Sequence, residues 1–273
     1  AERQGRAFGY SRAMDPLGAV LGLLTAAALI GLGAHVVRTM TMGTFRMLVL
    51  VAAIPGIIGV VLVVLFIRDQ AVTGEKRKPP RFSLKGYNRR FKAFLVITVV
   101  FTLGNSSDAF LILRSQQLGL SLVEILIMLA LFNLLTTIVA VPAGILSDRI
   151  GRPRVIIAGW LIYGLVYLGF AFITRAWQVW GLYIVYGAYY GATEGVGKAL
   201  VADVVTASEK RGTAFGLYNA AVGISALPAS FVAGLLWQKW GPAAPFLLGA
   251  VLSLLSVAAL AVLLGSRRPA PEA

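Results

Sequence analysis

The chain has 273 residues, of which 58% are hydrophobic and only 13% are charged, about half the charged share of an ordinary soluble domain. This composition excludes an intrinsically disordered chain and argues against a soluble globular domain. The net charge is +14, yet the basic residues lie between long uncharged runs, which is typical of membrane topology and not of nucleic-acid binding. With no cysteine and a single histidine, His35, the sequence offers no thiolate or histidine-based metal site, so we expect neither a metal nor a cofactor.

Eight apolar runs follow one another along the chain. A hydrocarbon core about 30 Å thick needs about 20 residues of helix, and the runs are 17–34, 47–67, 93–113, 125–147, 155–174, 176–205, 213–238 and 241–266. Because backbone groups in lipid must be satisfied within the structure, such runs form helices or the strands of a closed barrel. Barrel strands would be about ten residues of alternating polarity, whereas these runs are twice as long and do not alternate. The sequence therefore predicts an all-α, polytopic membrane helix bundle.

The basic residues are distributed unequally between the two sides of the membrane. Eight spans place both termini on one side, and the loops on that side hold most of the 25 Lys and Arg residues. Because cytoplasmic loops carry such an excess of positive charge, we expect a multi-pass protein of the cell membrane with both termini in the cytoplasm. Segment 68–92 is the most basic of these loops. It is either an ordinary cytoplasmic loop or an amphipathic strip on anionic lipid.

An internal repeat predicts how the helices are grouped. Residues 1–9 (AERQGRAFG) align without a gap with residues 208–216 (SEKRGTAFG), and six predicted spans separate the two copies. Parallel repeats of this kind are a transporter plan. The expected parts are the last two helices of an N-terminal six-helix unit in 1–67, a cytoplasmic linker in 68–92 and a complete C-terminal unit in 93–273. On this interpretation the chain begins inside a longer coding sequence, with four further helices before Ala1.

The third run carries polar residues that a lipid-facing helix would not tolerate without a role. On one continuous helix, four of them fall within an arc of about 120°: Thr98, Thr102, Asn105 and Asp108. An ionised carboxylate within a membrane needs water or a cation, so we expect this stripe to face a cavity on the path of a substrate or a proton. Hydrogen bonds between helices are the alternative explanation for the uncharged polar groups.

The loop between the fourth and fifth runs carries a specific motif, GILSDRIGRPR at 144–154. It resembles the signature loop of the major facilitator superfamily, Gly-x-Leu-x-Asp-Arg-x-Gly-Arg-Lys/Arg, with Pro153 inserted before the last basic residue. The matching residues to which we assign a gating role are Gly144, Asp148, Arg149, Gly151, Arg152 and Arg154. The resemblance implies the fold of that superfamily without its first four helices, and a loop that latches one conformation during transport.

Asp148 has a specific expected partner within this loop region. The resemblance places it beside the start of the first helix, near Gly9–Arg12, where N–H groups and the helix dipole favour an anion. A solvated turn that merely obeys the positive-inside rule is the alternative.

The sixth run corresponds to another helix that lines the central pathway in the superfamily. Its polar side chains recur every four residues and wind slowly around one helix face: Tyr186, Tyr190, Glu194 and Lys198. Glu194 can pair with Lys198 one turn away, so Glu194 either carries a proton or belongs to a structural ion pair. Three glycines form a second stripe that predicts close helix packing: Gly187, Gly191 and Gly195.

The first run carries a weaker family pattern. The spacing of Gly9, Gly18 and Gly22 is similar to that in antiporters of the superfamily, but Leu23 stands where a proline should follow. This pattern slightly favours an exporter. Gly18 and Gly22 are also an ordinary pair of small residues for helix packing.

We therefore predict a secondary active transporter of a small molecule, and not an enzyme, in which two helix bundles rock around a central site. Asp108 and Glu194 favour proton coupling, and export is slightly favoured over uptake. The alternatives are proton-coupled uptake of a sugar or organic anion, and a non-functional truncated membrane remnant. Because the sequence has no nucleotide-binding motif, ATP is not the expected energy source. The expected partners are the lipid bilayer, the substrate and protons, and no nucleic acid.

Overall fold

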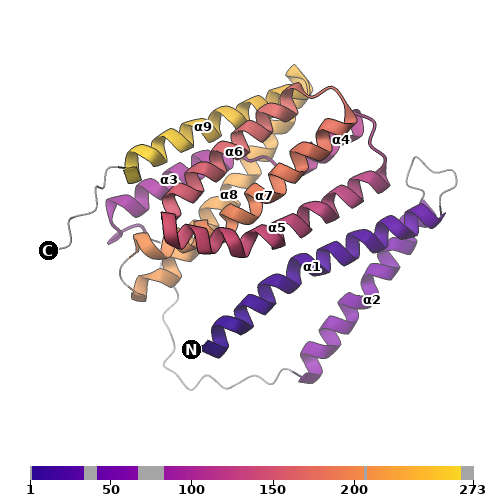
Figure 1. Cartoon of the computed structure of the whole chain (residues 1–273), viewed down its shortest axis with the longest axis horizontal. Coiled ribbons are helices and arrows are strands. Elements are labelled where there is room, and N and C mark those ends of the chain that lie inside the picture. The colour runs from indigo at the N-terminus through magenta and orange to yellow at the C-terminus, as the bar shows by residue number, and fades with distance from the viewer. Residues whose placement is uncertain (1, 34–41, 67–82, 206–207, 266–273) are drawn as a thin grey trace.

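Helices make up nearly all of the structure (Figure 1). The structure is a computed structural model that describes residues 2–33, 42–66, 83–205 and 208–265. Its helices are α1 (Glu2–Gly33), α2 (Met42–Phe66), α3 (Arg89–Gly104), α4 (Ala109–Gln117), α5 (Leu122–Ile150), α6 (Arg152–Phe172), α7 (Ala176–Val204), α8 (Ser208–Trp240) and α9 (Ala243–Gly265). No strand occurs within these ranges, and the predicted all-α membrane bundle is confirmed.

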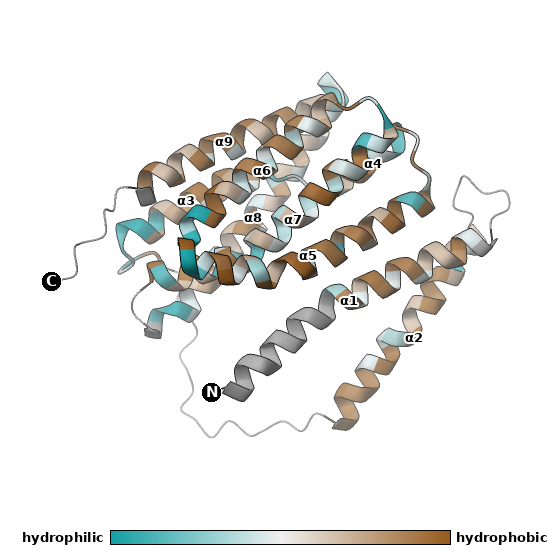
Figure 2. Cartoon of the chain, in the orientation of Figure 1, coloured by the Kyte–Doolittle hydropathy of each residue, from teal (hydrophilic) through white to brown (hydrophobic). Residues whose placement is uncertain are grey.

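Six segments of the described chain are long and apolar enough to cross a membrane. Five are the single helices α2, α5, α6, α8 and α9, and the sixth is formed by α3 and α4 in succession. The other two predicted spans are also helical. The apolar part of α1 is Pro16–Gly31, and α7 is 29 residues long but carries Glu194, Lys198 and Asp203 toward its C-terminal end. Figure 2 shows apolar residues along most of the helices and hydrophilic residues gathered near helix ends, which is the pattern expected of membrane spans.

The helix ends define two ends of the bundle. The turn from α5 to α6, the end of α7 and the start of α3 lie together at one end, which we term the basic end (Figure 1). The turns from α4 to α5 and from α6 to α7 lie at the opposite end. At that opposite end, Ser121 and Glu124 form a capping box that starts α5. At the basic end, Gly151 joins α5 to α6 with a φ of 95°, a conformation that favours glycine.

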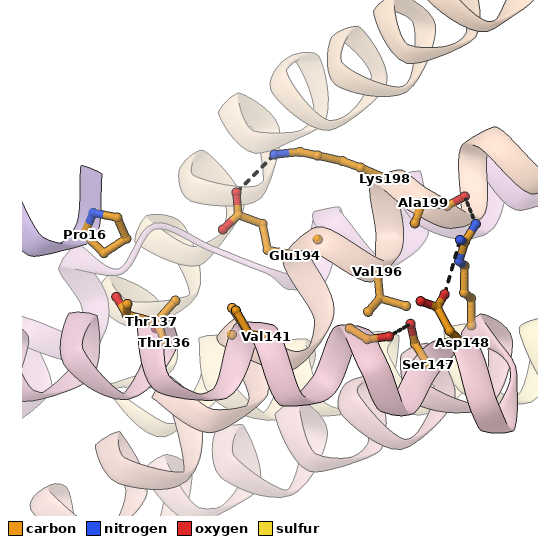
Figure 3. A pocket seen from close by; sticks show the side chains of 15 residues that line it. Pro16, Thr136, Thr137, Val141, Ser147, Asp148, Glu194, Val196, Lys198 and Ala199 are labelled. Atoms are coloured by element: carbon orange, nitrogen blue, oxygen red, sulfur yellow. Dashed lines mark hydrogen bonds and ion pairs between the residues drawn. The ribbon is translucent and has the colours of Figure 1, made fainter. Parts of the chain in front are cut away.

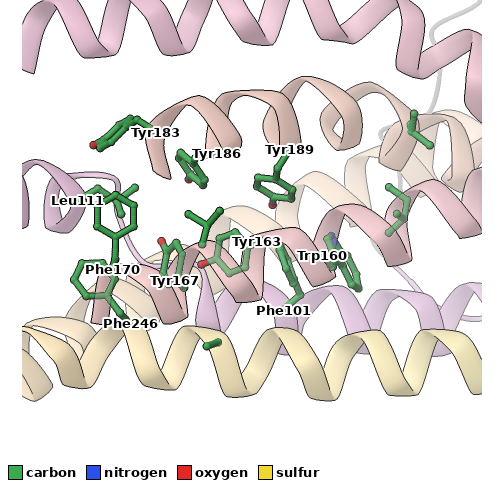
Figure 4. Packing of buried hydrophobic residues seen from close by; sticks show 14 of the residues in the cluster. Phe101, Leu111, Trp160, Tyr163, Tyr167, Phe170, Tyr183, Tyr186, Tyr189 and Phe246 are labelled. Atoms are coloured by element: carbon green, nitrogen blue, oxygen red, sulfur yellow. The ribbon is translucent and has the colours of Figure 1, made fainter. Parts of the chain in front are cut away.

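Aromatic side chains of α6 fill the centre of the bundle (Figure 4). Tyr163, Tyr167 and Phe170 are fully buried, and α6 packs against α7 on one side and α9 on the other. The rings of Tyr163 and Tyr167 lie 4.1 Å apart between centroids. Offset aromatic pairs at such distances add stability beyond the area they bury, so this core holds α3, α6, α7 and α9 as one unit.

The first two helices lie beside this unit. α1 packs along α5, whereas α2 meets α1 near one end and diverges from it (Figure 1). The apolar side chains of α2 are largely exposed, as at Leu50, Val64 and Phe66, which suits a helix surrounded by lipid. Most of the predicted linker 68–92 falls outside the described residues, so the predicted boundaries between the two units stay predictions.

Candidate transport pathway and gating motif

The third predicted span is interrupted where its polar residues lie. α3 ends at Gly104 and α4 begins at Ala109, so the span is not the single continuous helix on which we placed a polar arc. The intervening Asn, Ser and Asp residues are poor helix formers because their side chains compete for backbone groups. Tertiary contacts also hold the break open: the Ser107 N–H donates to the Ser230 hydroxyl of α8 at 3.2 Å.

The break separates the predicted polar stripe into buried and accessible parts. Thr98 and Thr102 are buried, and their hydroxyls donate to the carbonyls one turn earlier on α3, at 2.9 and 2.8 Å. Asn105 is half-buried, and its side-chain oxygen accepts from the Tyr163 hydroxyl at 3.4 Å. Asp108 is exposed. Of these four residues, only Asp108 is both ionisable and exposed.

Asp108 is tied to α7 through a hydrogen bond. The Tyr186 hydroxyl donates to the Asp108 carboxylate at 2.8 Å. Although Asp108 immediately precedes α4, its side chain makes no capping hydrogen bond to that helix. The carboxylate is therefore directed by the α7 tyrosine and not by the local backbone. This contact brings together residues from the two runs that we expected to line a common pathway.

The polar face of α7 continues from Tyr186 toward the basic end. Tyr190 follows one turn later and is half-buried. Glu194 follows one turn further, and its carboxylate accepts from the Lys198 ammonium group at 3.1 Å. Both side chains are partly exposed. The predicted i,i+4 pair is thus formed. Along α7, Tyr186, which binds Asp108, and Glu194 are about 12 Å apart.

A cavity of about 600 Å³ opens between α1, α5 and α7 (Figure 3). On the α5 side it is lined by Thr136 and Thr137, and on the α7 side by Glu194 and Lys198. Pro16 of α1 lines its third side. A volume of this size suits a small organic molecule. The ion pair on α7 therefore faces a space that a substrate could occupy.

Close helix packing occurs at some of the predicted glycines and not at others. A Cβ at Gly187 or Gly191 would lie 3.1 or 2.5 Å from a backbone oxygen of α5, so α5 and α7 are in direct contact there. At Gly195 a Cβ would meet nothing within 4 Å, which matches its place on the wall of the cavity. Gly18 and Gly22 on α1 also have open space around them.

The charged motif lies at the turn from α5 to α6 and at the basic end of the same cavity. The Arg152 guanidinium lies 3.4 Å from the exposed carboxylate of Asp148. It also donates to the Ala199 carbonyl at 2.9 Å and to the Asp203 carboxylate, both near the end of α7. Arg152 therefore connects the α5–α6 turn to α7 through two oxygen acceptors on α7, and it also contacts Asp148 at the end of α5.

The remaining motif residues make local contacts or none that the structure describes. Arg154 donates to the carbonyl of Ile150, and Arg149 is exposed. A Cβ at Gly144 would meet nothing within 4 Å, although Gly144 lines the cavity. The contact expected between Asp148 and Gly9–Arg12 involves residues whose surroundings lie outside those described.

Asp203 is a partner of the motif that the sequence pattern did not identify. It lies 51 positions after Arg152 and on a different helix, so no local spacing relates the two residues. A signal was nonetheless available, because the chain has only 11 acidic residues and Asp203 lies at the predicted cytoplasmic end of the sixth run. An acidic residue there needs a basic partner, and the adjacent loops supply several.

These features define a class of protein. A bundle of membrane-spanning helices contains an interrupted helix and carboxylates beside an interior cavity, and a charged turn joins two of its spans. The chain belongs to the Major Facilitator Superfamily, whose family model matches residues 93–273. Its helices long and apolar enough to cross a membrane fit that family.

Individual relatives agree with this assignment. The chain is 34% identical over 258 residues to the MFS-type transporter MJ1317 of Methanocaldococcus jannaschii. The alignment covers 92% of this chain and 62% of that protein. It is 37% identical over 150 residues to the class C tetracycline resistance protein of Escherichia coli, covering 53% of this chain and 37% of that protein. The class B protein is 30% identical over 130 residues, with 48% and 32% covered. The chain thus spans less than two thirds of the length of these relatives.

Proposed function

We propose that the protein is a proton-coupled secondary transporter that exports a small molecule across the cell membrane. One observation carries the proposal: two carboxylates adjoin α7, since Tyr186 of α7 donates to Asp108 and Glu194 of α7 lines the cavity. Ionisable groups inside membrane spans are costly and mark ion or substrate pathways. The names of the two tetracycline resistance relatives support the outward direction, because a membrane transporter protects a cell from a drug by removing it.

The two carboxylates suit different steps of coupling. Glu194 is held by Lys198, so a proton that neutralises Glu194 would release the lysine from its partner. Asp108 is held by one neutral hydroxyl and is open to an incoming cation or proton. Two groups of this kind on the same path allow protons and substrate to exchange places between the two sides of the membrane. The excess of Lys and Arg in the loops at the basic end supports a cytoplasmic position for that end and for both termini.

The charged turn serves as the latch in this proposal. Arg152 holds the α5–α6 turn against the end of α7, and α1 packs along α5 on the other side of the cavity. Closing the basic end would require these elements to stay together, and opening it would require the contacts to break. Alternating access by rocking of two units also fits the predicted division into 1–67 and 93–273 around the linker 68–92.

Transport into everted membrane vesicles tests this function, with tetracycline as the first candidate substrate. Vesicles that hold the protein should accumulate the drug when an inward-acidic proton gradient is imposed, and a protonophore should abolish the accumulation. Asp108→Asn and Glu194→Gln should each abolish gradient-driven accumulation, and Glu194→Gln should spare exchange of labelled for unlabelled drug. Glu124→Gln is the matched control, because its carboxylate serves only the capping box of α5. Retention of gradient-driven transport by both pathway variants would show that neither carboxylate couples the proton.

A further inference from the structure

One carboxylate beside the pathway lacks a cationic partner. The described residues form three ion pairs: Asp148 with Arg152, Asp203 with Arg152, and Glu194 with Lys198. Asp108 belongs to none of them. The nearest basic residue along the chain, Arg114, directs its guanidinium away, to the Ile173 carbonyl at 2.8 Å and to Gln117 at 3.5 Å. No basic side chain in the described part of the fold therefore neutralises the Asp108 carboxylate.

Aromatic rings adjoin this carboxylate. Tyr186, which donates to Asp108, stacks on Phe132 of α5 with 5.3 Å between ring centroids. Tyr190 adds a third ring, 5.5 Å from Phe132 and 6.3 Å from Tyr186. Tyr186 is buried and anchors the group, whereas Phe132 and Tyr190 are only partly buried. We name Phe132, Tyr186 and Tyr190 the aromatic wall. Figure 4 shows Tyr186 projecting from α7 between Tyr183 and Tyr189.

A carboxylate beside aromatic rings selects ligands by charge. The face of an aromatic ring is electrically negative and attracts a cation placed within about 6 Å of its centroid. An anion would meet the Asp108 charge and the same negative ring faces, so both features disfavour it. A strongly hydrated metal ion gains little from the rings, whereas an organic cation can neutralise Asp108 and bury its hydrocarbon groups on the wall.

We propose that Asp108 and the aromatic wall form the binding site for an organic cation, a quaternary or protonated amine or a phosphonium carrying apolar groups. This names the substrate class of the proposed transporter and rests on that function for its biological meaning. The binding itself does not depend on transport. The site takes one positive charge at Asp108 and places the apolar groups against Phe132 and Tyr190.

Equilibrium binding of tetraphenylphosphonium to the full chain in lipid nanodiscs tests the site. Triphenylphosphine oxide, which is aromatic and neutral, and tetraphenylborate, which has the same shape and the opposite charge, are the comparison ligands. Empty nanodiscs correct for partition into lipid. We expect saturable binding of the cation, with the neutral and anionic ligands at least about tenfold weaker. This ratio corresponds to about 1.4 kcal/mol. Equal saturable binding of the neutral ligand would overturn the proposal.

Variants assign the binding to these residues. Asp108→Asn should weaken the cation at least about tenfold, and Asp108→Glu, which keeps the charge, should restore most of the affinity. Tyr190→Leu should weaken it by about two- to fivefold, the loss of one exposed cation–ring contact. Glu124→Gln should bind like the unmodified protein. Circular dichroism and the thermal midpoint show whether each variant is folded. If Asp108→Asn does not fold, the test is the affinity of Asp108→Glu, which keeps the charge, compared with that of the unmodified protein.

The binding and transport experiments separate the two proposals. Unchanged cation affinity in folded Asp108→Asn would overturn the cation site, whatever the transport measurements give. Normal cation binding without gradient-driven flux of any bound cation would instead leave the site in place and overturn the proposed function.

Discussion

The two polar regions of the molecule hold their carboxylates in opposite ways. At the basic end, Asp148 and Asp203 share one guanidinium, that of Arg152, which also binds a backbone carbonyl. At the helix break, Asp108 receives one hydrogen bond from Tyr186 and no cation among the described residues. A carboxylate that is already neutralised can hold two helices together. A carboxylate held only by a neutral hydroxyl keeps its charge available for a proton or a cationic ligand. The comparison therefore separates residues that set the conformation from residues that bind.

Removing Arg152 should break the paired region and produce the largest effect of any change at the basic end. Arg152→Ala deletes all three contacts between the α5–α6 turn and its acceptors. We expect initial transport rates to fall at least about tenfold, or about 1.4 kcal/mol, at normal amounts of membrane-inserted protein. The transport rate of Arg152→Lys should lie between those of Arg152→Ala and the unmodified protein, because an ammonium group cannot bridge several acceptors as a planar guanidinium does. Arg154→Ala is the control, since Arg154 bonds only the carbonyl of Ile150. A rate for Arg152→Ala within about twofold of the unmodified protein would contradict the latch.

The second prediction concerns the contact between α5 and α7 at Gly191. A Cβ at Gly191 would lie 2.5 Å from the Thr136 carbonyl oxygen, whereas one at Gly195 has no neighbour within 4 Å. Gly191→Ala should force α5 and α7 apart and cost about 1–3 kcal/mol of stability. Gly195→Ala should be neutral or stabilising by up to about 1 kcal/mol, because alanine favours a helix more than glycine does. Thermal unfolding of the two variants in detergent compares them directly, and equal midpoints would show that α5 and α7 do not pack at Gly191.

The part of the structure that sequence predicted is the part encoded locally. Run lengths predicted the helical spans, and the 144–154 motif predicted the family, because each depends on residues close together in the chain. The position of the helix break was also signalled by Gly104, Asn105 and the two serines after it, but we placed these residues on one continuous helix. Sequence spacing could not show that Arg152 pairs with Asp203 or that Thr98 is buried. Both depend on how α3, α6 and α7 pack against one another.

The third prediction weakens the helix break itself. The Ser230 hydroxyl of α8 accepts a hydrogen bond from the Ser107 N–H and so supports the segment between α3 and α4 that contains Asp108. Ser230→Ala removes one hydrogen bond and should lower stability by about 0.5–1.5 kcal/mol. It should also weaken cation binding less than Asp108→Asn does, since the charge remains. Ser256→Ala is a suitable control, because the Ser256 hydroxyl donates only to a carbonyl of its own helix, that of Leu252. If the Ser230 and Ser256 variants have equal thermal midpoints and equal cation affinities, the cross-helix bond does not support the break.

The smallest effect is expected at Asp148, although its position in the motif gave it the central role in our sequence interpretation. Its carboxylate lies 3.4 Å from the Arg152 guanidinium, and its side chain is 68% exposed. Exposed pairs of this kind contribute about 0.2–1 kcal/mol, so Asp148→Asn should slow transport by no more than about fivefold. Asp203→Asn should slow it more, because Asp203 is the charged acceptor on α7 that Arg152 binds. Initial rates of the two variants at matched protein amounts test this order. If Asp148→Asn were the more damaging change, Asp148 would need a partner beyond Arg152. The start of α1, where the family resemblance places that partner, would then be the first place to seek it, with α1 substitutions tested in the Asp148→Asn background.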